Sequence, residues 1–549
     1  MATTNKQLSF IHKLHAIRNQ FGKTEAAEKL KLLHALALHP PKTKTVIKEY
    51  YPLLLFLLAY PDNEAVSNSA FANLQQLEQH IKGDLNIQYY LFNSTVTCTQ
   101  LCAAYSFEVA KWLREVHGPL ITWDSIDAED GQINSILSVV MPKVESEILQ
   151  DGNAHWKNWL LQNIHEGEDL LDALIQLFDQ SPIRPEIKDE LWTALGINLT
   201  ITLNTPDRLP ANLIFPHYHK NLVKKMSDVK ADSKPVQVKL TTADAAAIIE
   251  VSRMVLIKHF REIDPITFSA PQFVAYYKLS RGYTVALFGM RPERRHPIDA
   301  YMGYVAFKNG MPVSYAGSWV LFDSARIGLN VFPAYRGGES RYLFEQVMEL
   351  HRQVYRLKRL SVDPYQIGKD NKDGIHSGVF WLYHHIGFRP IEKEQKAIAE
   401  AEVKKITAQK GYRTPEPVLK KLADSRMEMV FKGKPFHPDA TDLSRAYQNY
   451  VRKHYKGNRK AAEQATLGPL ALAAGFKNIY EPVLNFVLVN WCVPLMHNPA
   501  WYTRHHGLKE QLHRVLELKA YGSEEEFMRA LQAAPELRAL LQEFVEQNA

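Results

Sequence analysis

The first third of the chain carries hydrophobic residues every three or four positions, which is the spacing of one buried helix face. The segments with this pattern are 26–38, 51–60, 70–81, 101–116 and 156–178. Prolines punctuate the pattern at Pro40, Pro61 and Pro182, as expected between helices. We therefore predict that residues 1–204 form an all-helical domain. It is either a bundle or an irregular α-solenoid, since no fixed repeat length is present.

Residues 205–239 have a different composition, with spaced prolines among Lys, Ser and Asp. This composition is typical of a linker or a long surface connection. The segment contains His217-Tyr218-His219. No carboxylate or cysteine stands near these histidines at ligand spacing. We interpret them as surface residues and expect no metal in the protein.

The pattern changes from helical to alternating within residues 240–433. A helix is predicted from Thr242 to Phe260, and strands are predicted by β-branched and aromatic runs. These strands are 283–288, 301–307, 312–322, 326–332, 360–363 and 426–431. Asn309-Gly310 between two of them is a strong hairpin signal, because both central positions of a type I′ turn need positive φ. The segment is therefore expected to form a mixed sheet with helices.

Residues 434–549 return to the helical pattern, with a capping box at Ser523 and Pro535 in the first turn of another helix. The predicted fold class is α+β and multidomain: a mixed sheet with helices in the middle, flanked by all-α regions. One stretch, 445–460, interleaves basic and aromatic residues. Such a stretch can hold single-stranded nucleic acid, but we favour a solvated helix face because no nucleic-acid motif accompanies it.

Composition changes this picture little. The chain has 549 residues, is 46% hydrophobic and 23% charged, and carries a net charge of +7, which is typical of globular proteins of several domains. Three cysteines cannot make a disulfide framework and favour a reduced compartment. The first residues lack the order of a secretion signal, and the longest apolar runs are too short to span a bilayer. We expect a cytoplasmic protein without a membrane partner.

The most informative segment runs from Arg326 to Pro390, where a strand, a glycine turn, a helix and a second strand follow one another. Arg336-Gly337-Gly338 ends the first strand, and a helix pattern begins soon after with Leu343 and Phe344. Glycine permits backbone angles and close approaches that a side chain prevents. A glycine turn that leads into a helix directs backbone N–H groups toward one point, which suits a pyrophosphate.

After the second strand comes Tyr383-His384-His385-Ile386-Gly387-Phe388. With the preceding loop, this segment resembles the acyl-CoA half of the GCN5-related N-acetyltransferases, and the resemblance covers residues 240–433. It implies acetyl-CoA or another acyl-CoA as co-substrate, with Tyr383 facing the sulfur as general acid.

The same resemblance implies the residues that bind the cofactor. Backbone groups of Leu329, Asn330, Val331 and Phe332 would bind the pantetheine arm and polarise the carbonyl. The phosphates would lie at a loop made by Arg336, Gly337, Gly338 and Ser340. The loop aligns with the family pattern only if one residue is missing after Gly337. Glu339 is favourable at a helix N-terminus but would repel a phosphate if it faced inward.

A general base is harder to assign. The strand 326–332 has no carboxylate, so the candidates are Asp363, Glu262, Asp264, His376 or a chain of waters. In the family, the loop after the first helix borders the acceptor site. Glu262 and Asp264 in this loop favour a cationic acceptor, which means an amine of a small molecule, a peptide, a protein or an amino-acid derivative.

Three functions remain open on the sequence. The first is an acyl-CoA-dependent N-acyltransferase in which an amine attacks the thioester directly. The second is a catalytically silent acetyltransferase-like module for ligand sensing or protein interaction, which the shortened loop and Glu339 favour. The third is a helical scaffold that binds a protein partner or RNA through its flanking regions. We favour the first and expect acyl-CoA and an amine as partners, with nucleic acid unfavoured.

Overall fold

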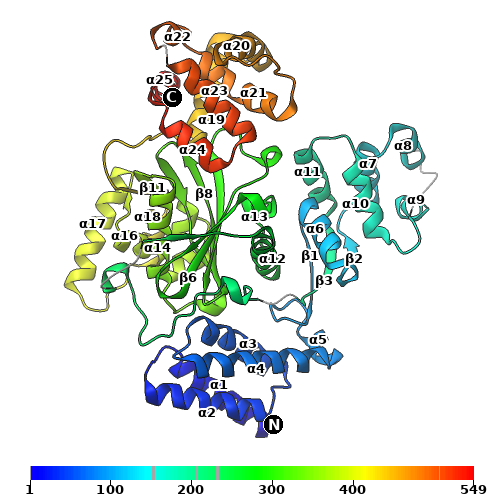
Figure 1. The fold of residues 1–549 in the computed structure, drawn as a ribbon, viewed down its shortest axis with the longest axis vertical. Helices are drawn as coiled ribbons and strands as arrows, with labels where there is room; N and C mark the ends of the chain where they lie inside the picture. The colour runs from blue at the N-terminus through cyan, green and yellow to red at the C-terminus, as the bar shows by residue number, and fades with distance from the viewer. Residues whose placement is uncertain (1, 151–154, 163, 205–206, 230–233, 506) are drawn as a thin grey trace. The chain divides into compact units, whose positions relative to one another are not determined.

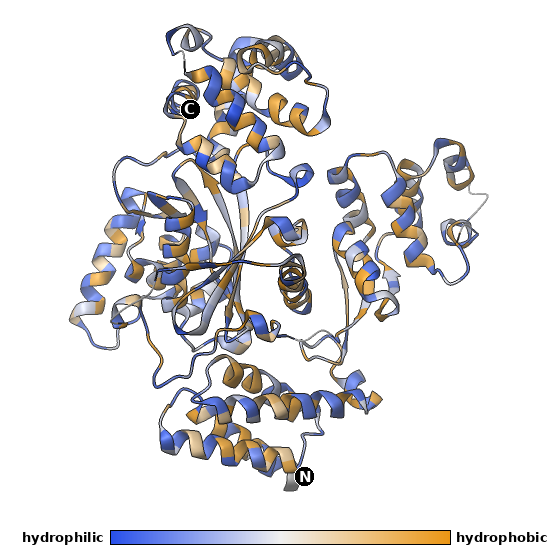
Figure 2. Ribbon diagram, viewed as in Figure 1, coloured by the Kyte–Doolittle hydropathy of each residue, from blue (hydrophilic) through white to orange (hydrophobic). Residues whose placement is uncertain are grey.

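The structure is a computed structural model that describes residues 2–150, 155–162, 164–204, 207–229, 234–505 and 507–549. The chain divides into two compact units. Unit 1 comprises Met1–Asn212, His217–Asn221 and Glu250–Glu262, and unit 2 comprises Leu213–Pro216, Leu222–Ile249 and Ile263–Ala549. Hydrophobic and hydrophilic residues occupy different sides of most helices in both units (Figure 2), as expected for helices that bury one face.

Unit 1 begins with five helices, α1 (Ala2–Ile17), α2 (Lys23–Leu38), α3 (Lys44–Ala59), α4 (Glu64–Lys82) and α5 (Leu85–Tyr90). The helix α3 is the core of this group, because every side chain from Leu53 to Ala59 is buried. Helices α2 and α3 both pack against α4. These helices confirm the period read from the sequence.

The rest of unit 1 corrects the prediction of an all-helical region. Strands β1 (Gln100–Ala104), β2 (Ile121–Ile126) and β3 (Ile197–Thr202) form an antiparallel sheet in the order β1-β3-β2. The alternation of β3, Ile-Asn-Leu-Thr-Ile-Thr, matches its alternating burial and is the two-residue period of a strand. The sequence interpretation extended helix over Leu101, whereas α6 begins only at Phe107.

Helices α6 (Phe107–His117), α7 (Asp130–Val140), α8 (Lys143–Gln150), α9 (Trp156–Leu161), α10 (Leu170–Gln180) and α11 (Pro185–Leu195) accompany this small sheet. Its core includes an aromatic cluster of Phe107, Phe178 and Trp192, in which Trp192 lies 5.2 Å from each phenylalanine ring. This core explains why a sheet of only three short strands is stable: helices cover it.

The segment predicted to be a linker is anchored rather than loose in its described part. Asp207 pairs with Lys258 at 2.5 Å and accepts a hydrogen bond from Tyr51 at 2.6 Å, all within unit 1. The ring of His219 is only 2% exposed, so the interpretation of a surface histidine was wrong. Residues 205–206 and 230–233 of the predicted linker lie outside the described residues.

Unit 2 contains a ten-stranded mixed sheet in the order β12-β13-β11-β9-β8-β7-β6-β5-β4, with β10 also paired to β8. Its strands are β4 (Val236–Val238), β5 (Val274–Lys278), β6 (Tyr283–Phe288), β7 (Ala300–Lys308), β8 (Met311–Leu321), β9 (Ser324–Ile327), β10 (Asn330–Val331), β11 (Arg359–Val362), β12 (Arg389–Pro390) and β13 (Met427–Val430). Among the described strands, β9 and β11 are the one parallel pair. The hairpin prediction is confirmed, since Asn309 and Gly310 have φ of 50° and 82°.

Helices cover both faces of this sheet (Figure 1). The helices around the sheet are α13 (Asp264–Thr267), α14 (Ser340–Val354), α15 (Lys372–Ser377), α16 (Val379–Ile386), α17 (Lys393–Ala408) and α18 (Glu416–Leu422). The helix α12 (Thr242–Lys258) begins in unit 2 and belongs to unit 1 from Glu250 onward. Tyr304 of β7 contacts His351 of α14, whereas its neighbour Gly303 contacts Pro265 of α13. Successive residues of a strand point to opposite faces, so we call these faces the α14 side and the α13 side.

The C-terminal helices confirm the predicted helical pattern and belong to unit 2. They are α19 (Ala440–Tyr455), α20 (Arg459–Ala474), α21 (Pro482–Met496), α22 (Ala500–Arg504), α23 (Leu508–Tyr521), α24 (Glu524–Gln532) and α25 (Pro535–Asn548). The capping box at Ser523 is present. Gln532 donates hydrogen bonds to the carbonyls of Phe322 and Tyr355, which fixes these helices to one end of the sheet.

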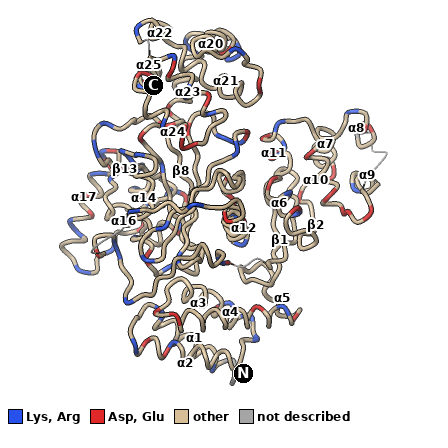
Figure 3. The backbone as a smooth tube through the Cα atoms, viewed as in Figure 1, with Lys and Arg blue, Asp and Glu red and all other residues tan. Residues whose placement is uncertain are grey.

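Surface charge and hydropathy add two observations. Positive and negative side chains are interspersed along most helices (Figure 3). Among the described residues, no helix is long and apolar enough to cross a membrane. The coarse prediction of an α+β chain with a mixed sheet and flanking helices is confirmed.

Candidate functional site

The candidate site is a break in the sheet at Gly328 and Leu329. The sequence predicted one strand over 326–332, but the structure has two short strands, β9 and β10, which both pair with β8 in one continuous register. The parallel neighbour β11 pairs only with residues 324–326. Beyond Arg326 the two parallel strands therefore separate. Backbone groups at such a separation are available to a ligand instead of a neighbouring strand.

Two tyrosine hydroxyls meet this break from the α14 side. Tyr304 of β7 donates a hydrogen bond to the carbonyl of Gly328 at 2.9 Å. Tyr383 of α16 bonds with the backbone of Leu329, while burial raises its pKa. Burial also raises the pKa of Tyr304, and the nearby hydroxyl of Tyr383 adds to that effect. Both hydroxyls are therefore held in the neutral, proton-bearing form at the break.

The ring of Tyr383 is locked by its neighbours. Phe344 and Phe388 contact it edge-on at 5.3 and 5.6 Å between ring centroids, and its side chain is 1% exposed. Gly387 before Phe388 has φ of 130°, a conformation that favours glycine. The spacing Tyr-x-x-x-Gly-Phe therefore has a local structural reason, because it brings Phe388 into contact with the ring of Tyr383.

A side chain fills the opening between the separated strands. Gln366, in the turn that follows β11, comes within 3.0 Å of the position that a Cβ on Gly328 would occupy. No residue larger than glycine fits at position 328 without moving this glutamine. A ligand that enters between β10 and the turn must displace Gln366.

The predicted phosphate loop connects β10 with α14. Arg336 and Gly337 are exposed, and Gly337 has φ of 84°. The N–H of Gly338 donates to the carbonyl of Tyr335 at 3.2 Å, so it closes the turn. Ser340 is the first residue of the 15-residue helix α14. The loop therefore has the expected glycine turn before a helix N-terminus.

Glu339 departs from the expectation that it would lie free at the helix terminus. It is 1% exposed and accepts hydrogen bonds from Arg281 at 2.6 Å and from the N–H of Val223 at 2.9 Å. It also pairs with Lys308 at 3.1 Å. Two buried cations offset its charge. Replacing Glu339 by glutamine would therefore leave Lys308 buried beside a neutral partner.

Electrostatics favours an ionised Glu339. Burial opposes its ionisation, but the charges of Lys308 and Arg281 outweigh burial and lower its pKa. Burial lowers the pKa of Lys308 to about 7, against the opposing attraction of Glu339. Since β7 carries Lys308 and α14 follows Glu339, this buried cluster joins the β7–β8 hairpin to the loop.

The carboxylate candidates lie at different places. Asp363 follows β11 and pairs with Arg326 at 3.2 Å and with Arg426 at 3.6 Å. Asp264 is the first residue of α13, near enough to Tyr301 to influence its pKa. Both belong to unit 2. Asp363 is therefore paired with two arginines rather than left without a partner.

The remaining candidates for the base are Glu262 and His376. Glu262 belongs to unit 1 and accepts hydrogen bonds from the N–H and hydroxyl of Ser106, at 2.8 and 2.6 Å. Ser106 caps α6, so Glu262 stabilises a helix start. His376 is exposed on α15.

Sequence reasoning missed Tyr304, Gln366, Arg281 and Lys308. Alternation along the predicted strand 301–307 could have identified Tyr304. Every second side chain of a strand points to the same face of the sheet, and the face that contains Tyr304 is covered by a predicted helix. Gln366 and Arg281 lie in two different turns, and Lys308 lies at the end of strand β7. No local pattern identifies which distant groups such residues contact.

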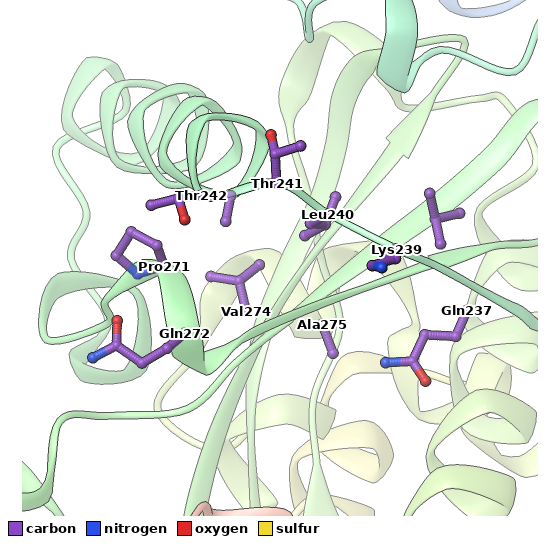
Figure 4. A pocket seen from close by; sticks show the side chains of 11 residues that line it. Gln237, Lys239, Leu240, Thr241, Thr242, Pro271, Gln272, Val274 and Ala275 are labelled. Carbon is purple, nitrogen blue, oxygen red and sulfur yellow. The ribbon is translucent and has the colours of Figure 1, made fainter.

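A separate hollow of about 560 Å³ lies at the edge strand β4 and the start of α12 (Figure 4). Gln237 and Lys239, Thr241 and Thr242, and Pro271 and Gln272 line it from three sides. Lys239 is its one charged lining residue among the described residues. The strand β4 stands five strands away from β9, or about 24 Å at the usual strand spacing. This hollow is therefore distinct from the break at Gly328.

Comparisons of the chain with protein-family models, with curated proteins and with solved structures gave no match.

Proposed function

We propose that unit 2 is an acyl-CoA-dependent N-acyltransferase and that its reaction takes place at the break between β9 and β11. One observation carries this proposal: Tyr383 and Tyr304 bring two neutral hydroxyls to the backbone of Leu329 and Gly328 where the parallel strands separate. The order of the elements also supports the proposal. In this mixed sheet a helix follows each of the two parallel strands along the chain, as the resemblance to GCN5-related N-acetyltransferases implies.

The chemistry follows from direct attack. The nitrogen of a neutral amine forms a bond to the thioester carbon and loses one proton to a chain of waters. The carbon–sulfur bond breaks, and the sulfur leaves as a thiolate that accepts one proton. Tyr383 is placed to supply that proton, since burial keeps its pKa high and a general acid must hold its proton until the leaving group needs it. Positioning of the two substrates supplies much of the remaining rate.

The loop at the start of α14 is the proposed phosphate site. The helix has 15 residues, so the partial positive charge at its N-terminus is well developed. Arg336 is exposed beside it and carries a fork of donors suited to phosphate. The burial of Glu339 against Lys308 and Arg281 supports this assignment, because its carboxylate is turned away from solvent and offset.

The direct test is to measure acetyl-CoA binding by calorimetry and then thiol release with a panel of amines. We expect saturable binding and amine-dependent thiol release. CoA binding without transfer to any amine would reject the enzyme and favour the alternative below. Absence of CoA binding by the folded protein would reject the enzyme and a CoA-sensing module, and would leave the protein-binding form of the alternative.

The alternative is a catalytically silent module that senses a ligand or binds a protein partner. Two observations favour it: Tyr383 is 1% exposed, and Gln366 occupies the space beside Gly328. The two functions differ in one measurable property, since only the enzyme must release a thiol.

A further inference from the structure

The α13 side of the sheet carries a row of stacked side chains across three strands. Tyr301 of β7, Trp319 of β8 and Arg326 of β9 are direct cross-strand neighbours. The rings of Tyr301 and Trp319 stack at 4.4 Å, with 10° between their planes, and the guanidinium of Arg326 lies 4.4 Å from the Trp319 ring. Trp319 thus holds the guanidinium plane in a fixed orientation.

A small cavity of about 40 Å³ lies over this row, with Arg326 and Asp299 among its lining residues. Residues 437–441, at the start of α19, close it from above the sheet. One water-sized position takes about 10–15 Å³ in this measure. The cavity therefore has room for about three such positions.

The arginines of the cavity differ in how far their hydrogen bonds are used. Arg359 donates to Glu428 at 2.8 Å and to the carbonyl of His437 at 3.0 Å. Arg426 donates to Asp439 at 2.6 Å. Among the described residues, the ion-pair partner of Arg326 is Asp363 at 3.2 Å, and the buried Nε of Arg326 makes no hydrogen bond there. Arg326 therefore has donors left for a ligand.

Asp299 is the matching group of opposite charge. It is 6% exposed. Its carboxylate has one hydrogen-bond partner among the described residues, the ring of His296 at 3.3 Å. A buried carboxylate gains strongly from a second donor, above all from a cation. One cavity is thus lined by a cation and an anion that both have hydrogen-bonding capacity in reserve.

We propose that this cavity binds the zwitterionic headgroup of a free amino acid, with its α-carboxylate on Arg326 and its α-ammonium on Asp299. Arginine forms paired hydrogen bonds with carboxylates, and the stacked guanidinium is oriented in advance. Gly328 lies two residues beyond Arg326 along the strand, or about 7 Å. A side chain of four or five atoms that ends in an amine spans this distance. The acceptor class is therefore a diamino acid, acylated on its side-chain nitrogen, and this part of the inference rests on the proposed function.

The experiment compares ligands that differ in one headgroup feature. L-lysine and L-ornithine carry both headgroup charges, lysinamide and cadaverine lack the carboxylate but keep the ammonium, and Nα-acetyl-lysine lacks the α-ammonium. We expect lysine or ornithine to bind in calorimetry, and lysinamide, Nα-acetyl-lysine and cadaverine to bind at least about tenfold more weakly, since each loses a charged hydrogen-bond partner.

Two variants assign the contacts. Arg326→Gln should abolish the preference for lysine over lysinamide, and Asp299→Asn should abolish the preference for lysine over Nα-acetyl-lysine, each without changing affinity for acetyl-CoA. Matched controls are Arg452→Gln and Asp373→Asn, at exposed positions on α19 and α15. Thermal unfolding of each variant identifies any that fails to fold, and the ligand series on the unaltered protein does not depend on them.

The possible outcomes test the headgroup site and the transferase activity separately. Discriminating binding of lysine or ornithine together with thiol release supports the whole inference. The same binding without thiol release supports the headgroup site and rejects the transferase. Equal binding of lysine and lysinamide overturns the inference, and so does absence of amino-acid binding by a folded protein that binds acetyl-CoA.

Discussion

The two faces of the unit 2 sheet use polar groups in opposite ways. On the α14 side, Tyr304, His351 and Tyr383 are at most 1% exposed and are fixed by rings and backbone groups. On the α13 side, the side chains of Arg326 and Asp363 are 27% and 30% exposed. Burial fixes these three neutral side chains in place, whereas Arg326 and Asp363 stay partly exposed and can exchange partners. The break at Gly328 is where the two kinds of surface meet.

This comparison predicts that changes on the α14 side alter either chemistry or stability strongly, and that changes at the open loop alter binding more weakly. The largest effect is expected for Tyr383→Phe. The ring and its contacts remain, so the fold should survive. Turnover should fall by about 10²–10⁴-fold if the hydroxyl delivers the proton. Thiol release at saturating amine measures it.

Tyr365→Phe is the control, since Tyr365 is 60% exposed and should leave turnover unchanged. Wild-type turnover of Tyr383→Phe, on a substrate whose chemical step limits the rate, would remove Tyr383 from the mechanism.

The next effect concerns the buried cluster below the loop. Glu339→Gln leaves Lys308 and Arg281 without their shared carboxylate, and breaking a buried ion pair in this way costs about 3–5 kcal/mol. Urea unfolding should show that loss. Glu400→Gln on the exposed face of α17 should change stability by less than about 0.5 kcal/mol. Equal midpoints for the two variants would show that the cluster is not buried in solution.

A third prediction uses acid. Burial lowers the pKa of His351 to about 4, whereas in the unfolded chain it is about 6.5. Between these values the unfolded state binds the proton and the folded state does not, so stability is lost as pH falls from 6.5 toward 4. The loss amounts to roughly 3 kcal/mol.

The measurement is the slope of unfolding free energy against pH, which should flatten in His351→Gln and stay unchanged in His376→Gln, at an exposed site. Identical slopes in all three proteins would contradict the assignment of a neutral His351.

The smallest effect is expected at the open loop. Gly338→Asp adds a carboxylate and bulk beside the start of α14, and a charge near a helix terminus contributes about 0.3–1 kcal/mol. Affinity for CoA should therefore fall several-fold, with thermal stability nearly unchanged. Calorimetry with CoA measures it, and Gly338→Asn separates charge from bulk. A folded Gly338→Asp protein with unchanged CoA affinity would reject the phosphate site.

The accuracy of the sequence predictions followed the range of the interactions involved. The hairpin at Asn309-Gly310, the strand over 283–288 and the helix α14 were predicted, because each depends on neighbours within a few residues. The small sheet of unit 1 was missed, although β3 alternates, because β1 and β2 are short and stand among helices. Whether a short segment forms a strand depends mainly on its packing against strands that are distant in the sequence.

The candidate site shows the same division. The spacing from Tyr383 to Gly387-Phe388 was read directly from the sequence, and the structure gives it a local reason in the contact of the two rings. The role of Glu339 was misread. Its partners Arg281 and Lys308 are 58 and 31 residues away, and no local pattern distinguishes a buried glutamate of this kind from an exposed one.

The sequence by itself determined the helices, most of the central strands, the glycine turn and the position of Tyr383, because dihedral preferences and hydrophobic period act over short distances. Only the tertiary structure decided where the parallel strands separate, which hydroxyl meets which backbone group, and which charges are already paired. These properties depend on contacts between distant segments, and the free energy of such contacts depends on burial that no segment has alone.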